Sequence, residues 1–534
     1  MAWDYYRRLF KGRVELTAPP ESYGTPNDGI IRVTAAVNHP NEPGANDQMQ
    51  DVLFSTASQI EEHIDAGTFD KDGNGFLSPD ELTVAFVIAG RSRCTGSCLD
   101  SDVPMVRGYA RTLSLLADDE DLLILDGIKV PNYAVQPERG ILSASGYKDT
   151  FAIATLIHEL GHAVFGVSDH YGEYDNSDEF TEYLGDWCLL SDTGLRRPSD
   201  NQIGPQYFSG YTKLETNLIK AQAIEDSQVI GLDSAAEASL DDDGTDSSIA
   251  RVWLDPYQVR ESLVFEYRDN QGYDSFLSGE GAIVTRTQSL AANNKTAPPS
   301  YRRASLVSGG SGYDGAIGTG QVGEFIAQSD TPGYTDDPIF APRTVTLRYD
   351  GVSNDRAFFD ISVDEFGPPR GHLRYDEGAG DEMNIHSNEA FYGFTDEIKA
   401  YAGTLFVNTT QFDTIDGVEL LVRDASSVTI EIYAGILDDD TPYDLLSTES
   451  FEFSTGGWHR AFFDNPVDFP PDEARFIVVG IETPSVTTFV LPYVLHNDRA
   501  KYEVQTFSSA DGLRFRSADN RVYRQILLLS KQDG

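Results

Sequence analysis

The sequence predicts a multidomain α+β protein in which a mixed helix–strand region is followed by all-β modules. With 534 residues the chain exceeds what one hydrophobic core usually supports. Helical and strand patterns mix up to about residue 295, and short alternating strand patterns with turn signals follow. We therefore expect a helix–strand domain at 1–295, a small β module at 296–368 and a β-sandwich at 369–534.

Individual segments support this division. Asp47 to Asp65 has the amphipathic spacing of a helix, and Leu82 to Ala89 reads as a buried strand ended by Gly90. Phe151 to Phe165 is a long apolar-rich run without proline, which indicates a buried helix. Later strands are expected at three alternating segments: Thr344–Tyr349, Val418–Val422 and Phe476–Gly480.

The composition is strongly acidic. Forty Lys and Arg residues against 86 Asp and Glu residues give a net charge of −46, which argues against nucleic acid and anionic membranes as partners. No stretch approaches the roughly 20 apolar residues of a membrane-spanning helix, so we expect no membrane insertion. A salt-rich environment or many calcium sites would each explain the acidity, and we favour a halophilic origin.

Three cysteines occur. Cys94 and Cys98 are close enough in sequence for a local disulfide, which would suit an oxidising compartment. Cys188 is then the odd thiol, and we expect it to be buried. The N-terminus lacks the apolar core of a signal peptide, so we expect that the chain begins downstream of its natural start.

The chemistry is predicted by His158-Glu159-Leu160-Gly161-His162. On a helix, His-Glu-x-x-His places two imidazoles one turn apart on the same face, where both can bind one zinc ion. Zinc polarises a bound water, and Glu159 can take its proton as general base. Gly161 allows close packing against the helix. Histidines that only form hydrogen bonds are the alternative interpretation.

A catalytic zinc site needs a third protein ligand. Metzincins place a glycine and this ligand at positions that here hold Phe165 and Ser168, whereas Gly166 and Asp169 come one residue later. Asp169 is the first choice for the third ligand. Its rivals are His170 and Glu182.

A second metal motif lies in the Asp70–Glu81 segment, which matches the twelve-residue calcium loop. Because Glu81 leads into a strand and no partner loop is present, we expect a structural calcium clip and not a calcium sensor. The expected calcium ligands are Asp70, Asp72, Asn74, Phe76 (through its backbone), Ser78 and Glu81.

The first 290 residues resemble the catalytic domain of the immune inhibitor A family of secreted bacterial zinc metallopeptidases. The matching segments occur in family order: Asp4–Arg7 with Gly12–Leu16, the calcium loop with Val87–Gly90, Tyr133–Glu138, Gly185–Ser191, Phe265–Arg268 with Gly272–Asp274, and Gly281–Val284.

This resemblance implies a zincin-type fold, an extracellular location, zinc-dependent endopeptidase activity on protein or peptide substrates, and calcium-supported stability. It assigns His158 and His162 as zinc ligands and Glu159 as the catalytic residue. Asp169 matches the family's aspartate only with one inserted residue. Leu190 replaces a methionine that packs beneath the metal and is not a ligand.

From Gly371 onward the sequence resembles the lectin-like jelly-roll modules of secreted proteases, through Arg374–Gly378 and Gly456–His459. Trp458 could stack on a carbohydrate, although a core or rim position is the more common use of a tryptophan. We expect a monomer. The alternative to an active peptidase is a decayed peptidase scaffold that acts as a carbohydrate- or surface-binding adhesin.

Overall fold

The structure is a computed structural model of residues 1–534. Its described residues are 2–37, 39, 46–92, 105–106, 108–112, 122–139, 153–170, 184–191, 205–255, 257–258, 261–277, 280–288, 304–306, 316–317, 322–326, 344–364, 370–374, 391–392, 399–422, 426–436, 442–454, 457–482, 491–495, 505–509, 516–517, 521–523 and 525–531.

The predicted fold class, a zincin-type α+β domain followed by β modules, is wrong. Strands dominate the described residues from Val84 onward, and the longest described helix has 13 residues. The single helix expected at Asp47 to Asp65 is not observed either. The hydroxyls of Ser55 and Thr56 donate to the carbonyls of Val52 and Leu53, and the segment divides into two short helices there.

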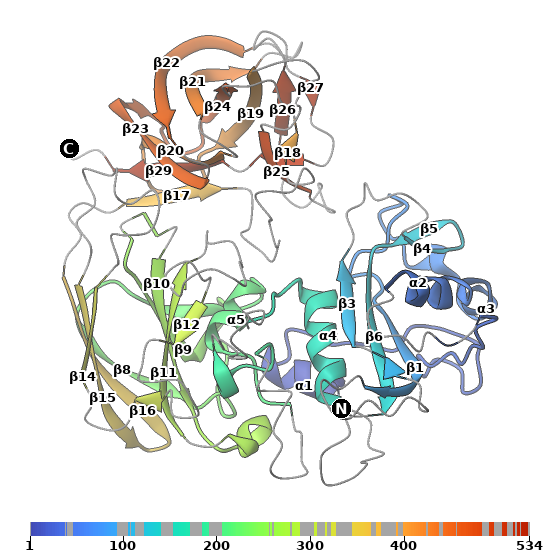
Figure 1. The fold of residues 1–534 in the computed structure, drawn as a ribbon. Coiled ribbons are helices and arrows are strands. Elements are labelled where there is room, and N and C mark those ends of the chain that lie inside the picture. The colour runs from blue at the N-terminus through green and yellow to red at the C-terminus, as the bar shows by residue number, and fades with distance from the viewer. Residues whose placement is uncertain are drawn as a thin grey trace.

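The first sheet has the strand order β2-β1-β6-β3 (Figure 1). The strand expected at Leu82–Ala89 is present as β1, but it does not end at Gly90 and continues to Ser92. It pairs in parallel with β6, and β3 pairs antiparallel with β6. The bounds of the elements around this sheet are α1 Ala2–Leu9, α2 Asn46–Phe54, α3 Ala57–Glu61, β1 Val84–Ser92, β2 Met105–Val106, β3 Tyr109–Thr112, β4 Leu123–Leu125, β5 Ile128–Val130, β6 Asn132–Arg139 and α4 Ile153–Phe165.

The two faces of this sheet enter different cores, because successive side chains of a strand point to opposite sides. Tyr133 and Val135 of β6 pack with residues of α2, α3 and the β4–β5 hairpin. Ala134, between them, packs with α1 and α4. The sheet therefore holds α4 on one side and the calcium-loop region on the other.

A second sheet, with the order β12-β11-β10-β9-β7, lies on the other side of α4 (Figure 1). Its central strand β10 is buried along its whole length. Val264 packs in the core that contains α4, whereas Leu263 and Phe265 pack in the next core. The elements here are α5 Gly210–Glu215, β7 Lys220–Ile224, β8 Gln228–Asp233, β9 Thr245–Trp253, β10 Glu261–Arg268, β11 Gly281–Gln288, β12 Ala304–Leu306 and β13 Ala316–Ile317.

A third sheet, with the order β14-β15-β16-β8, joins distant parts of the sequence. Its strands are β14 Val322–Ile326, β15 Thr344–Ser353, β16 Arg356–Val363 and β8, and β16 pairs antiparallel with β8. The expected boundary at residue 295 remains a prediction, but this sheet contains strands from both sides of it.

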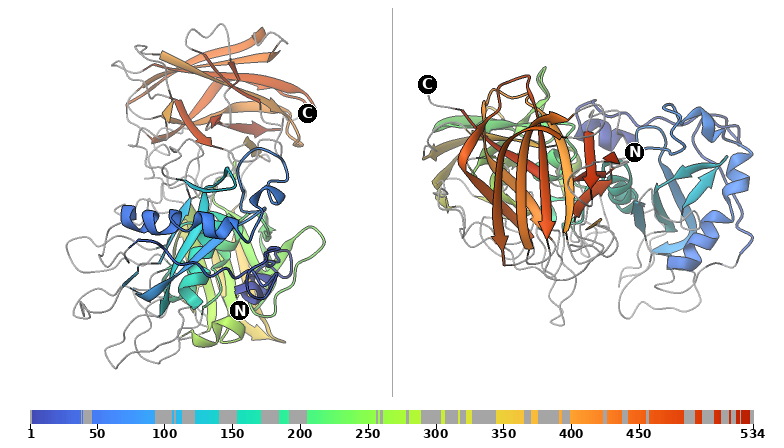
Figure 2. Two further views of the ribbon diagram at one scale, coloured as in Figure 1. Left: turned by 90° about the vertical axis from the view of Figure 1, so that its right-hand side faces the viewer. Right: turned by 90° about the horizontal axis from the view of Figure 1, so that it is seen from above.

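The C-terminal residues form two sheets with the orders β17-β29-β20-β23 and β22-β21-β24-β19-β26-β27. Their inner faces share one apolar core, and Figure 2 shows the two layers. The main strands are β17 Arg370–Arg374, β19 Lys399–Val407, β20 Thr414–Val422, β21 Ser426–Ile436, β22 Pro442–Phe453, β23 Gly457–Asp468, β24 Ala474–Glu482, β26 Gln505–Ser509, β27 Arg516–Ser517 and β29 Gln525–Ser530. A small third sheet pairs β18 Phe391–Tyr392, β25 Leu491–Leu495 and β28 Arg521–Tyr523.

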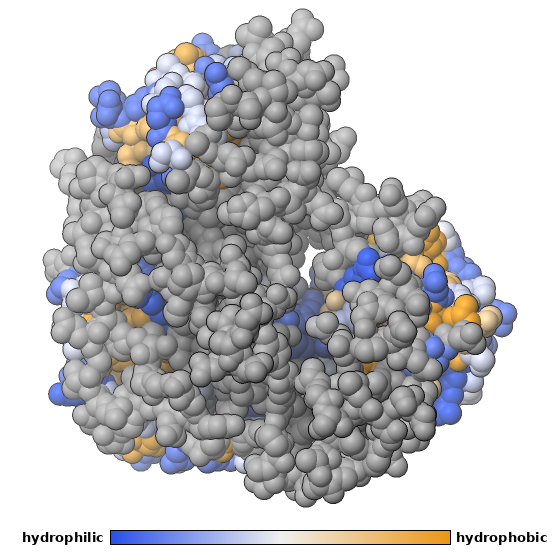
Figure 3. Space-filling model, in the orientation of Figure 1, coloured by the Kyte–Doolittle hydropathy of each residue, from blue (hydrophilic) through white to orange (hydrophobic). Residues whose placement is uncertain are grey.

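Among the described residues, no helix is both long and apolar enough to cross a membrane. On the face drawn in Figure 3, the coloured residues are mostly hydrophilic, and hydrophobic atoms occur in separate small groups.

Candidate metal centre

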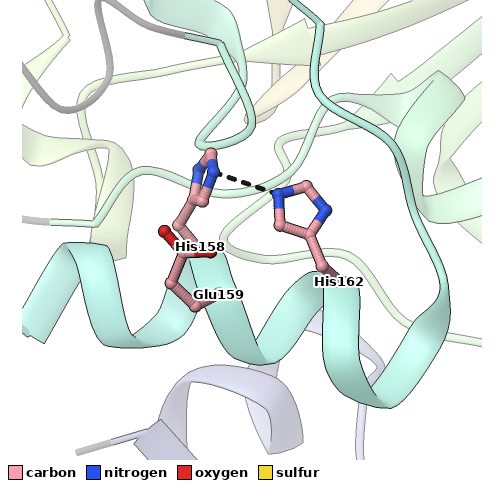
Figure 4. Close-up of side chains that lie close together, drawn as sticks. All are labelled: His158, Glu159 and His162. Carbon is pink, nitrogen blue, oxygen red and sulfur yellow. Dashed lines mark hydrogen bonds between the residues drawn. The ribbon is translucent and has the colours of Figure 1, made fainter. Parts of the chain in front are cut away.

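The His-Glu-x-x-His motif lies on helix α4, and both histidine rings project from the same face with their nitrogens turned toward each other (Figure 4). His158 and Glu159 are buried. Gly161 allows close packing on this helix, as expected, because a Cβ there would lie 3.0 Å from the ring of Phe208. The motif is therefore held rigidly between the first and second sheets.

The end of α4 explains how the chain returns to the histidines. Gly166 has φ +65°, a left-handed conformation that ends helices, and its N–H donates to the carbonyl of His162 at 2.9 Å. The chain then turns back, so that Asp169 reaches both rings. The turn at Gly166 thus brings the carboxylate of Asp169 next to both rings.

Three donor atoms meet at one point. The Nε2 atoms of His158 and His162 lie 3.1 Å apart, and the Oδ1 of Asp169 is 3.1 Å from each of them. Zinc bonds to nitrogen and oxygen are about 2.0–2.2 Å, so neighbouring donors of a tetrahedral site lie roughly 3.3 Å apart. Two imidazoles and one carboxylate at this spacing fit a three-ligand zinc site whose fourth position is open.

Hydrogen bonds on the far side of each ring determine which nitrogen faces this point. The Nδ1 of His158 is 3.0 Å from the carbonyl of Leu189, and the Nδ1 of His162 is 2.5 Å from the carbonyl of Val167. A carbonyl accepts only from a protonated nitrogen, so each Nδ1 carries a proton and a neutral ring keeps its Nε2 lone pair for a metal. Both rings are therefore held with Nε2 turned toward the same point, as a metal site would require.

The charges around the three donors favour a cation. Burial lowers the pKa of both histidines, but the nearby carboxylates outweigh it and raise the pKa of His158 and that of His162, the latter to about 9. Burial raises the pKa of Asp169, but the charge of His162 and the hydrogen bonds of both rings hold it well below its usual range. A divalent ion would supply the same positive charge.

Glu159 lies beside the ligands, with a carboxylate oxygen within 4.8 Å of a nitrogen of each histidine. Its Oε1 faces Gly108, where a Cβ would lie 3.3 Å from that oxygen and 2.9 Å from Thr155. Gly108 directly precedes β3. The carboxylate therefore lies between the two histidines and the start of β3.

Of the two rivals for third ligand, the structure describes only His170, whose ring does not lie with the other two. The Nε2 of His170 lies 2.9 Å from the hydroxyl of Thr212, within the core. Glu182 lies outside the described residues, as do Cys94 and Cys98 of the expected disulfide. Cys188 is buried and free, as expected.

Sequence reasoning missed the groups that hold the histidines. The carbonyls of Leu189 and Val167 have no signal in the sequence, because any residue supplies a carbonyl. Arg268 is fully buried, makes two 2.5 Å contacts to Asp274, and donates to the carbonyl of Trp187 at 2.7 Å. It thereby holds the turn that contains Leu189. The signal in the sequence was weak, because the strand of Arg268 also contains the charged residues Glu261 and Glu266.

The expected calcium loop is folded around its acidic side chains. Oxygens of Asp70, Asp72 and Glu81 lie within 4.8 Å of one another. The N–H groups of Asn74 and Gly75 donate to the carboxylate of Asp70 at 3.0 Å. Gly75, at the sixth position, has φ +82°, the conformation that the sharp turn of such loops needs.

The second half of the loop is attached to strand β5. Leu77 donates to the carbonyl of Lys129 at 2.9 Å, and Lys129 donates back to Gly75 at 3.0 Å. Phe76, whose carbonyl is an expected ligand, forms a bridge with Lys129. The N–H of Ser78 donates to Glu81 at 3.0 Å. The loop therefore joins the segment before β1 to the β4–β5 hairpin.

Comparison with protein-family models and with curated proteins finds no match. Among solved structures, the chain is similar to the cysteine protease and lectin-like domains of Cwp84, a surface layer associated protein of Clostridium difficile, at 11% identity and a TM-score of 0.24. The alignment covers 51% of this chain and 52% of that chain.

The clostridial cysteine protease Cwp84 after propeptide cleavage is similar at 13% identity and the same TM-score of 0.24, over 51% of this chain and 58% of that chain. This chain thus spans a little over half the length of the solved structures that it matches. At these TM-scores the likeness carries no argument about fold or activity.

Proposed function

We propose that this chain is a zinc-dependent endopeptidase. The observation that supports it is the convergence of His158 Nε2, His162 Nε2 and Asp169 Oδ1, with each pair 3.1 Å apart, beside the carboxylate of Glu159. The proposal rests on the chemistry of this site and not on the predicted zincin fold. The resemblance to the immune inhibitor A family remains a prediction.

Zinc, when bound, would polarise water and a substrate carbonyl. Glu159 would accept a proton from the attacking water and pass it to the leaving nitrogen. His158 and His162 hold their Nε2 atoms in place through the Leu189 and Val167 carbonyls. Asp169 supplies the one negative charge among the three ligands.

Strand β3 supports a peptide as the substrate. It is the last strand of its sheet in the described part of the chain, and it packs beside α4. An extended peptide can add to such an edge through backbone hydrogen bonds. Gly108, directly before β3, allows the backbone to pack closely against Glu159, because a Cβ there would lie 2.9 Å from Thr155 and 3.3 Å from the Oε1 of Glu159. A peptide added along this edge would lie next to the strand that packs against α4, the helix that carries Glu159.

We also propose that the Asp70–Glu81 loop binds calcium as a structural clip. Its ligand pattern and its hydrogen bonds to Lys129 support this role. The loop belongs to the core on the opposite side of the first sheet from α4. Calcium is expected to stabilise this part of the chain and to take no part in the hydrolysis.

The test is cleavage of unfolded casein at high salt with calcium and zinc. We expect Glu159→Gln to lower kcat by about 10²–10⁴-fold, the usual contribution of a general base, with the melting temperature nearly unchanged. Glu280→Gln, at an exposed position, is the control and should retain full activity. Cleavage by Glu159→Gln at the wild-type rate would refute the proposal. No cleavage by the wild type would favour a binding protein built on this scaffold.

A further inference from the structure

His170 directly follows the candidate ligand Asp169, but its side chain points the other way, into the core. The ring is 1% exposed. Its Nε2 lies 2.9 Å from the hydroxyl of Thr212 and 3.4 Å from a carboxylate oxygen of Glu215, and the ring packs against Tyr211 with centroids 5.6 Å apart. All three partners belong to helix α5.

The backbone of His170 is fixed as well. Its N–H donates to the carbonyl of Leu190 at 2.9 Å, and its own carbonyl accepts from the hydroxyl of Ser191 at 3.2 Å. Leu190 follows Leu189, whose carbonyl orients the ring of His158. The turn at Leu189–Ser191 therefore contacts both His158 and His170, the residue that follows Asp169.

The partner of the ring is itself held in place. The hydroxyl of Thr212 lies 2.8 Å from that of Ser209, which caps the N-terminus of α5, and 3.3 Å from the sulfur of Cys188. Thr212 is fully buried. His170 is thus attached to a rigid group of buried residues and not to a side chain that moves in solvent.

We propose that His170 is a positioning residue that acts through Asp169. This inference rests on the proposed zinc site. Asp169 lies between two fixed points, the left-handed turn at Gly166 and the buried ring of His170. Groups that orient metal ligands typically contribute about 10–100-fold to metal affinity. Without the contact between His170 and α5, the carboxylate of Asp169 would lose its fixed distance to both Nε2 atoms.

The experiment measures zinc affinity of the full chain by competition with a chromogenic chelator, at a temperature where every variant is folded. His170→Ala should weaken zinc binding about 10–100-fold. His170→Gln, which keeps a donor near Thr212, should recover most of that loss. Thr212→Val should weaken binding in the same direction, and Thr212→Ser should not. Ile249→Val, a change in the same core, controls for general loss of stability and should bind zinc like the wild type.

A double mutant separates positioning from direct ligation. If His170 acts through Asp169, then His170→Ala should have little further effect on zinc affinity in a chain that already contains Asp169→Ala. Equal losses in both backgrounds would show that His170 contributes independently, and wild-type affinity in His170→Ala would show that it contributes nothing. Either result overturns the inference and leaves the proposed function intact. Absence of zinc binding by the wild type overturns both.

Discussion

Arg460 of β23 forms a bidentate ion pair with Asp255, which lies 205 positions earlier in the chain, with contacts of 3.2 Å and 2.6 Å. The Nε of Arg460 also donates to Glu419 at 3.0 Å, and all three side chains are buried. The guanidinium lies over the ring of Tyr257, whose hydroxyl donates to Asp416. These contacts join the C-terminal sandwich to the connection between β9 and β10 of the second sheet.

This relationship predicts a large effect of Arg460→Met. The change leaves the carboxylates of Asp255 and Glu419 buried without their shared cation, and breaking such a group costs about 3–5 kcal/mol. We expect a lower melting temperature in calorimetry and separate transitions for the sandwich and the remainder. Arg348→Met is the control, because its partners are partly exposed and such pairs contribute about 0–1 kcal/mol. If Arg460→Met and Arg348→Met lower the melting temperature equally, the buried ion pairs of Arg460 contribute no more to stability than exposed pairs do.

Calcium removal should lower stability without direct loss of catalysis. A ligand at 1,000 times its dissociation constant stabilises a fold by about 4 kcal/mol. We therefore expect a calcium-specific chelator to lower the melting temperature of the wild type. Asp70→Asn should have a lower melting temperature even with calcium and a smaller response to the chelator. Asp243→Asn, in another acidic loop, should respond like the wild type. An unchanged response in Asp70→Asn would argue against this loop as the calcium site.

Lys11 predicts a pH dependence of stability. Burial, reinforced by the charge of Lys213, lowers the pKa of Lys11 from 10.5 to about 8. Between about pH 8 and 10.5 the unfolded chain therefore binds a proton that the folded chain has released, so stability contributed by this group rises with pH. The full change is about 3 kcal/mol at 1.36 kcal/mol per pKa unit.

The measurement compares the melting temperatures of wild type and Lys11→Met from pH 7 to 10.5. The melting temperature of the wild type should rise relative to that of the variant as the pH increases, because only the wild type has the lysine. Lys220→Met, at an exposed lysine, is the control and should show a nearly constant difference. If the difference in melting temperature between wild type and Lys11→Met is also constant over this pH range, the pKa of Lys11 is not lowered by folding.

The helix of the candidate site could be predicted from the sequence, whereas the sheets around it could not. The apolar run from Phe151 to Phe165 corresponds to α4, and the His158–His162 spacing places both rings on one face of it. Asp169 was preferred over His170 and Glu182, and the structure places Asp169 between the rings. Local spacing was sufficient there because these residues are one helix and one turn apart.

The rest depended on contacts that local patterns do not contain. The pairing of β8 with β16 joins residues 228–233 to residues 356–361, and no periodicity within either strand identifies its partner. The same limit explains the wrong fold class, since a helix that contains the motif does not determine the layers around it. The carbonyl of Leu189, which orients His158, is equally invisible because every residue has one.

The most direct test of the zinc site is X-ray absorption at the zinc edge on the zinc-loaded wild type and on Asp169→Ala. We predict one zinc per chain with two imidazole nitrogens and one carboxylate oxygen at about 2.0–2.2 Å, together with water. Asp169→Ala should lose the carboxylate and keep both imidazoles. Sulfur ligation, fewer than two imidazoles, or an identical spectrum for Asp169→Ala would contradict the assignment of His158, His162 and Asp169 as the zinc ligands.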